Sequence, residues 1–320
     1  MACTTENQSD LQVVFGDVTL GVCSGQTKYI FSYDAGGLVS LVKSGREWIY
    51  RFPRPAFWRA TTDNDRGSRF SLGSAMWMGA DQFVGKGEIH VFLDGKEQTG
   101  FRAPDNNQYR GVVCAEKIAI SFTYPTPTVP QTKVTVEYTI LGGGQMQVRV
   151  HYYGKEGLPQ LPAFGLRFLM PTAASGYAWD GLSGETYPDR MAGAVRGHFE
   201  EKGLPVTPYL VPQDCGVHMQ TERLVVTRES VLANEIADPG TFSLTFEQLD
   251  APFAFSCLPY TPLELESATH IEELPPARRT VVTILGAVRG VGGIDSWGTN
   301  VEDAYHIPAE KDITFGVVIR

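Results

Sequence analysis

Three stretches of the sequence alternate apolar and polar side chains: residues 117–124 (KIAISFTY), 133–140 (KVTVEYTI) and 145–152 (QMQVRVHY). Their apolar positions are Ile118, Ile120, Phe122 and Tyr124, then Val134, Val136, Tyr138 and Ile140, then Met146, Val148, Val150 and Tyr152. Because successive side chains of a strand point to opposite faces, each stretch predicts a half-buried antiparallel strand. Residues 141–144 (LGGG) predict a hairpin connection between the last two strands.

Shorter apolar stretches between turn signals predict further strands. They cover residues 12–21, 28–33, 165–170, 223–228, 242–248, 280–288 and 312–319. Thr261, Pro262 and Glu264 occupy the N-cap, N1 and N3 positions of a capping box, which predicts a short helix from about 262 to 270. Since strands and helices do not alternate, we expect an all-β fold, a large antiparallel β-sandwich. We expect a single domain over 11–320, preceded by a flexible tail at 1–10.

The charge balance argues against two classes of partner. The chain has 320 residues, with 27 basic and 36 acidic side chains and a formal net charge of −9. A net negative surface does not attract nucleic acid or anionic lipid, and no run of Lys and Arg residues offsets it. We therefore expect neither nucleic acid nor a membrane as a partner.

The cysteines and the N-terminus argue for a cytoplasmic protein. The chain has five widely spaced cysteines: Cys3, Cys23, Cys114, Cys215 and Cys257. Their odd number and spacing indicate neither a disulfide framework nor a zinc site. The first residues are polar, which is not typical of a signal peptide, and no window approaches 18 apolar residues. We expect no metal bound by this chain.

Residues 55–67 (PAFWRATTDNDRG) are unusually rich in Arg and Asx side chains for a strand sandwich. Arg and Asx side chains at this density hydrogen-bond either a polar ligand or one another in a structural network, and we keep both interpretations. A calcium-binding EF-hand is excluded, because Gly67 stands where an oxygen ligand is required and Ser74 stands where a glutamate is required.

Residues 290–298 (GVGGIDSWG) place Trp297 among four glycines. An exposed indole face is suited to stacking on the apolar face of a sugar ring, whereas a Trp folded back onto the sheet is the equal alternative. The stretch lacks the full dinucleotide or Walker pattern, so it does not predict a phosphate site. The six histidines show no spacing typical of metal ligands.

Four motifs resemble a known family: FWRATTDNDRG at 57–67, YPDR at 187–190, TPY at 207–209 and GIDSWG at 293–298. They are similar to the C-terminal domain of lactose-operon β-galactosidases, and more closely to the small subunit of two-chain bacterial β-galactosidases (glycoside hydrolase family 2). The resemblance runs from about residue 11 to the C-terminus. It implies a galactose mutarotase-like β-supersandwich, in agreement with the strand pattern.

The resemblance also implies a division of labour. The family's enzymes are retaining hydrolases of terminal β-galactosides such as lactose, and retaining hydrolysis needs two carboxyl groups about 5 Å apart. Both are glutamates on an α/β barrel, which this chain lacks, so we expect them on a separate large subunit and no catalytic residue here. Magnesium and sodium ions are expected on the large subunit as well, and no cofactor on this chain.

The resemblance assigns roles to individual residues. Trp297 matches the tryptophan that stacks on the acceptor sugar, and Gly67 matches the hinge of a mobile active-site loop. That loop is expected at about 67–74, with Ser68, Arg69 and Phe70 near its start, although GSRFSLGS departs from the single-chain enzymes. The residues expected to form the loop's buried polar frame are Arg59, Asp63, Asn64 and Asp65. The YPDR motif is expected to be structural or interfacial.

Two other functions remain open from the sequence. A stand-alone mutarotase-like aldose epimerase would need a histidine and a carboxylate converging on the sugar, and no motif places His151, His198 or His218 with an acid. A free carbohydrate-binding module would suit an acidic sandwich with aromatic side chains. The small-subunit interpretation is favoured by the paired loop motifs.

Overall fold

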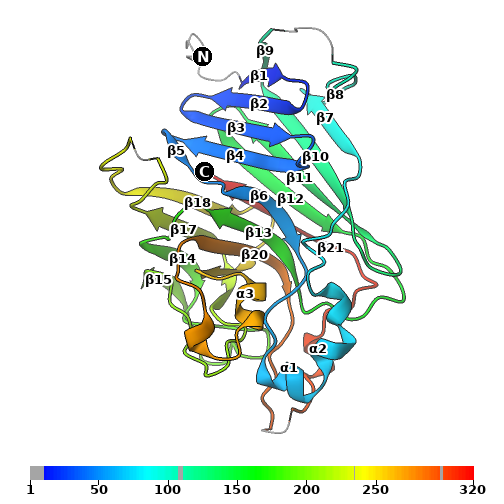
Figure 1. Cartoon of the computed structure of the whole chain (residues 1–320), viewed down its shortest axis with the longest axis vertical. Coiled ribbons are helices and arrows are strands. Elements are labelled where there is room, and N and C mark those ends of the chain that lie inside the picture. Colours follow the sequence, from blue (N-terminus) through cyan, green and yellow to red (C-terminus); the bar gives the residue numbers. More distant parts are fainter. Residues whose placement is uncertain (1–10, 107–110, 234, 296–297) are drawn as a thin grey trace.

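The computed structural model describes residues 11–106, 111–233, 235–295 and 298–320, and these fold into three antiparallel sheets (Figure 1). The predicted tail at 1–10 lies outside the described residues. In spatial order the six-stranded sheet contains β5 (Arg46–Glu47), β4 (Gly37–Lys43), β3 (Thr27–Ser32), β2 (Thr19–Ser24), β1 (Leu11–Phe15) and β9 (Val113–Ala115). The five-stranded sheet contains β16 (Val217–Thr221), β19 (Phe253–Leu258), β20 (Thr280–Val288), β13 (Ala163–Met170) and β6 (Arg51–Ala56).

The ten-stranded sheet is the broadest element. Its strands are, in spatial order, β15 (Arg196–Lys202), β14 (Gly176–Leu182), β17 (Arg223–Arg228), β18 (Phe242–Gln248), β21 (Ile313–Ile319), β12 (Gln145–Tyr152), β11 (Lys133–Leu141), β10 (Lys117–Pro125), β7 (Ile89–Leu93) and β8 (Lys96–Gln98). The described helical segments are short: α1 (Asp63–Gly67), α2 (Phe70–Gly73), α3 (Pro262–Ser267), and the 3-10 turns η1 (Ala75–Trp77), η2 (Ile271–Glu273) and η3 (Asp303–Tyr305). None of the described helices is long and apolar enough to cross a membrane.

The three alternating stretches form β10, β11 and β12, which pair side by side as predicted. Ile120 lies opposite Tyr138, and Tyr138 lies opposite Val148, so the apolar faces of the three strands are in register. All twelve apolar side chains of this face are buried. The hairpin at 141–144 is confirmed, with positive φ angles at Gly143 and Gly144, which only glycine adopts without strain.

Aromatic contacts show how the sheets form layers. The ring of Phe31 on β3 lies 5.3 Å from Tyr138 on β11, and Phe164 on β13 lies 5.4 Å from Tyr152 on β12. Both smaller sheets therefore pack on the apolar face of the ten-stranded sheet, the arrangement visible in Figure 1. The prediction of a large antiparallel β-sandwich is confirmed.

The structure corrects three local predictions. The strand expected at 12–21 is two strands, β1 and β2, because the chain reverses at Gly16, whose N–H donates to the carbonyl of Thr19. The helix expected at 262–270 has its predicted capping box but ends at Ser267. Helices α1 and α2 were not predicted. Helix α1 begins with a second capping box, in which Asp65 rather than the usual Glu or Gln pairs with Thr62.

The close approach of β13 and β20 at Gly165 can be tested by substitution. A Cβ atom at Gly165 would lie 2.3 Å from the carbonyl oxygen of Ile284 on β20, beside a register shift. We expect Gly165→Ala to lower the free energy of unfolding by about 1–3 kcal/mol, the usual cost of overpacking. Gly73→Ala is the control, because a Cβ atom there would have nothing within 4 Å and alanine favours a helix. Equal denaturation midpoints for the two variants would contradict this packing.

Candidate functional site

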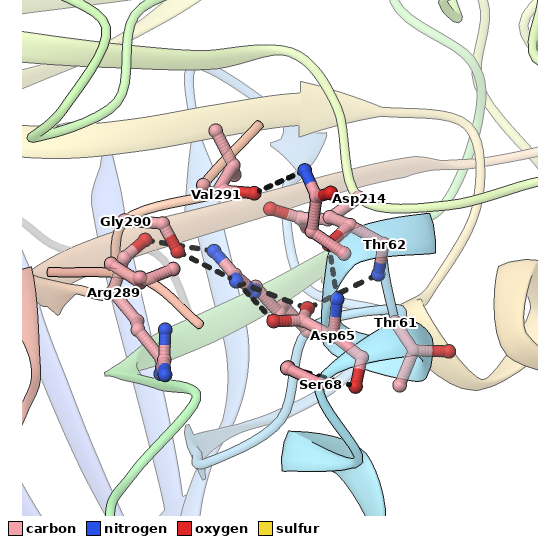
Figure 2. Close-up of polar contacts among 12 residues, drawn as sticks. Thr61, Thr62, Asp65, Ser68, Asp214, Arg289, Gly290 and Val291 are labelled. Carbon is pink, nitrogen blue, oxygen red and sulfur yellow. Dashed lines mark hydrogen bonds and ion pairs between the residues drawn. The ribbon is translucent and has the colours of Figure 1, made fainter. Parts of the chain in front are cut away.

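The two motif-rich segments lie side by side at one end of the sandwich. The first runs from β6 through Arg59 into α1, and the second runs from the end of β20 through Arg289 and the glycine-rich stretch. We call the polar contacts that join them the Arg59 frame: the side chains of Arg59, Asn64, Asp65 and Asp189, with the backbone of residues 289–292. The Arg59 guanidinium donates to Asp65 and to the carbonyls of residues 289 and 290. Figure 2 shows the centre of the frame, with Asp65 on one side and Arg289 and Gly290 on the other.

Arg59 is the centre of this frame. Its side chain is 3% exposed, and Nη2 lies 3.0 Å from each carboxylate oxygen of Asp65, which is 2% exposed. Nη2 also donates to the carbonyl of Gly290 at 2.9 Å, and Nη1 donates to that of Arg289 at 2.7 Å. Burial by itself lowers the pKa of Arg59, but the negative charges of Asp65 and Asp214 outweigh it and raise the pKa. The guanidinium thus joins two segments about 230 residues apart in the sequence.

Asn64 and Asp189 hold the stretch that follows. The Asn64 amide donates to the carbonyl of Val291 at 3.0 Å. The Asp189 carboxylate accepts from the N–H of Val291 at 3.0 Å and from that of Gly292 at 2.7 Å. Asp189 belongs to the YPDR motif, so the structure gives that motif a definite position: it fixes the glycine-rich backbone.

Two further contacts join the second segment to residues 67–74. A Cβ atom at Gly298, where φ is +84°, would lie 2.4 Å from the Cα of Gly67, so the two backbones touch at a position that requires glycine. The Phe70 ring on α2 lies under the guanidinium of the buried Arg289, with 3.8 Å from its central carbon to the ring centroid. A displacement of either segment therefore disturbs the other.

The structure places the expected site residues in three groups. Arg59 and Asp65 are buried partners, and Asn64 is partly buried beside them. Asp63 departs from the expected buried position, because its side chain is 76% exposed and pairs with Arg66 at 3.1 Å. Trp297 lies outside the described residues.

Residues 67–74 are short helical turns rather than an extended loop. Gly67 ends α1, Ser68 caps it, and Arg69 takes a left-handed conformation with φ of +60° before Phe70 opens α2. A positive φ is uncommon for a residue other than glycine and marks a sharp change of direction. The mobility of this segment stays a prediction.

A cavity of about 420 Å³ opens beside the Arg59 frame. Its lining residues include Asp63, Asn64, Glu185, Tyr187, Arg190, Tyr209, Asp214 and Gly293. Asp214 accepts a hydrogen bond from the Tyr187 hydroxyl at 2.9 Å, and burial raises the pKa of its carboxyl group to about 7 in spite of Arg59 nearby. Asp214 was not predicted from the sequence, because it lies some 150 residues from the motif that it faces.

The cavity offers carboxylates, amides and phenols, groups that bind hydroxyl-rich ligands. Within the described part of the chain, no three His, Cys, Asp or Glu side chains cluster closely enough to hold a metal ion. The geometry is therefore that of a polar recess beside the hydrogen-bonded Arg59 frame.

Comparison with known proteins gives a consistent result. The family model described as beta galactosidase small chain matches residues 24–319. A β-galactosidase small subunit from Latilactobacillus sakei is 56% identical over 305 residues, which are 95% of this chain and 96% of that protein. A β-galactosidase from Halalkalibacterium halodurans is 34% identical over 310 residues, but the match spans only 28% of its length.

Solved structures also match. A putative aldose 1-epimerase from Escherichia coli K12 matches with a TM-score of 0.44 and 10% identity over 92% of this chain and 96% of that one. A galactose mutarotase-like protein from Lactobacillus casei matches with a TM-score of 0.42 and 11% identity, over 94% of this chain and 99% of that one.

The buried ion pair predicts different consequences for two neighbouring aspartates. Asp65→Asn leaves the buried Arg59 without its counter-charge, so the free energy of unfolding should fall by about 3–5 kcal/mol. Asp63→Asn makes the same chemical change in the same helical turn at an exposed position, and should cost less than about 1 kcal/mol. Chemical denaturation compares the two. Similar losses would show that Arg59 does not depend on Asp65.

The raised pKa of Asp214 predicts a pH effect on stability. Between about pH 4 and 7 the unfolded chain has an ionised Asp214 and the folded chain a protonated one, so folding takes up a proton. Stability from this group falls as pH rises through that window, by at most about 1.4 kcal/mol per pH unit.

Asp214→Asn should remove this contribution, so the variant should gain stability relative to the parent between pH 4 and pH 7. Denaturant titrations at several pH values measure the difference. A difference that is flat over the window, or that falls, would contradict the prediction.

Proposed function

The chain belongs to the β-galactosidase small chain family, and from this premise we propose that it is the non-catalytic but essential small subunit of a two-chain, retaining β-galactosidase. The enzyme hydrolyses terminal β-galactosides such as lactose in the cytoplasm. The partner is a large subunit that carries both catalytic glutamates, as in glycoside hydrolase family 2, together with the magnesium and sodium ions.

The observation that carries this proposal is the share of the relatives' length. The chain spans 96% of the Latilactobacillus sakei small subunit, but only 28% of the β-galactosidases from Halalkalibacterium halodurans and Streptococcus thermophilus. In the proposed enzyme the remaining part is a separate polypeptide. The epimerase and carbohydrate-binding alternatives are not favoured by these relatives.

In the proposed enzyme the chain's own residues complete the acceptor side of the active site. Trp297 stacks on the glucose or other leaving sugar, and residues 67–74 close over the site and exclude water. The contacts of the Arg59 frame support this role, because residues 289–292 are bound at successive backbone groups just before Trp297. The residues that lead into the Trp297 segment are thus held in place by hydrogen bonds.

Contacts beside the Arg59 frame also support coupling between residues 67–74 and the segment that carries Trp297. Because Gly67 touches Gly298 and Phe70 stacks on Arg289, a movement of residues 67–74 would also displace the segment that carries Trp297. Loop closure and acceptor binding are therefore linked in this proposal. The catalytic carboxyl groups, which must be about 5 Å apart for retention, belong to the large subunit.

The division of labour is tested by expression of this chain alone, of its large partner alone and of both together. We expect hydrolysis of a chromogenic galactoside only when both chains are present. Activity of the small chain alone would contradict the proposal, as would full activity of the large chain alone.

The acceptor role is tested at Trp297 in the assembled enzyme. Trp297→Ala removes an aromatic stacking surface worth about 1 kcal/mol, so the affinity for glucose as acceptor should fall about fivefold. The galactosyl-transfer step should change less, and Trp297→Tyr should restore much of the affinity. Unchanged glucose affinity in Trp297→Ala would refute the role.

A further inference from the structure

A second cavity, of about 330 Å³, lies between the five-stranded sheet and the α3 region and is lined by five arginines. We call it the arginine cavity. Its arginines are Arg51 and Arg54 on β6, Arg167 on β13, and Arg278 and Arg279 just before β20. None of these residues belongs to the Arg59 frame or to the cavity beside it.

The two carboxylates of the arginine cavity are already engaged. Asp81 is buried and pairs with the buried Arg167 at 2.7 Å. Glu264 is bound to the backbone N–H and hydroxyl of Thr261 in the capping box of α3. Five arginines less two carboxylates leave a formal charge of +3 in a chain whose net charge is −9.

In the part of the chain that the structure describes, the other four arginines have no carboxylate partner. Among the described residues, no carboxylate lies within 4 Å of Arg51, Arg54, Arg278 or Arg279. Arg279 stacks on the Tyr50 ring with 3.7 Å from its central carbon to the ring centroid, and none of its side-chain N–H groups has a hydrogen-bond partner within the described chain. Stacking positions a guanidinium through its face and leaves its N–H edge available for an oxyanion.

The floor and walls also suit a small ligand. Burial lowers the pKa of Arg167 in spite of Asp81, so another negative charge nearby would stabilise the floor. Apolar and aromatic side chains supply contact for a carbon skeleton: Phe52, Leu169, Pro259, Tyr260, Leu263 and Pro275. The volume lies at the lower end of the range for small-molecule sites.

We propose that the arginine cavity binds a small, multiply charged anion, either a phosphate ester or a polycarboxylate. Guanidinium groups bind phosphate and carboxylate by the same two-pronged hydrogen bonding, so the cavity fits both. The site is separate from the proposed acceptor site, and its ligand is not the galactoside.

The experiment is calorimetric titration of the full chain, alone and together with its large subunit, with glucose 6-phosphate, inorganic phosphate and citrate. We expect at least one of these probes to bind with one site per small chain, and more weakly as salt is raised. Preference for glucose 6-phosphate over citrate identifies a phosphate ester as the ligand class, and the reverse identifies a polycarboxylate.

Arg51→Gln/Arg278→Gln removes two exposed guanidinium groups from the cavity, and binding of the preferred probe should weaken at least about tenfold. Arg102→Gln is the matched control, since it removes an exposed guanidinium elsewhere and should leave the affinity unchanged.

Three results would overturn the proposal: no binding of any probe, equal loss in the control, or binding to the lone chain that the large subunit abolishes. The last result would mean that acidic side chains of the partner occupy the cavity.

Discussion

The buried guanidinium of Arg59 is the constraint on which the candidate site of this molecule depends. A charged group that is 3% exposed is stable only when it is paired and hydrogen-bonded, and Arg59 meets this need with Asp65 and two carbonyls. Those carbonyls belong to residues 289 and 290, so one side chain sets where the chain after β20 must run. The glycines and α2 are then placed by contact with this frame.

Most of the sandwich could be predicted from the sequence, because its central strands are buried on one face only. The alternation in β10, β11 and β12 follows directly from that one-sided burial. Pairing between distant strands was not predictable in the same way. Strand β21 lies between β12 and β18, and the local sequence pattern of residues 313–319 does not indicate that it pairs with these two strands. Helix α1 was missed because its capping box uses Asp65, although Thr62 marked its start.

The candidate site was predictable where its partners share one motif. Arg59 and Asp65 are six residues apart, and their type and spacing already suggested a polar network. Asp189 and Asp214 could not be joined to it, since only the folded sheets bring residues that far apart into contact. The sequence has no run of Lys and Arg residues, and the arginine cavity could not be predicted from it for the same reason. The five arginines of the arginine cavity come from three separate places in the sequence and meet only in the fold.

We propose that residues 57–74, 289–295 and 298–301 form one unit that faces an active site on another chain. The most direct measurement is the structure of the complex between this chain and its large subunit with a bound galactoside. We expect both segments at the mouth of the sugar site, with Trp297 against the leaving sugar. A complex in which these segments face solvent, away from the bound sugar, would contradict this claim.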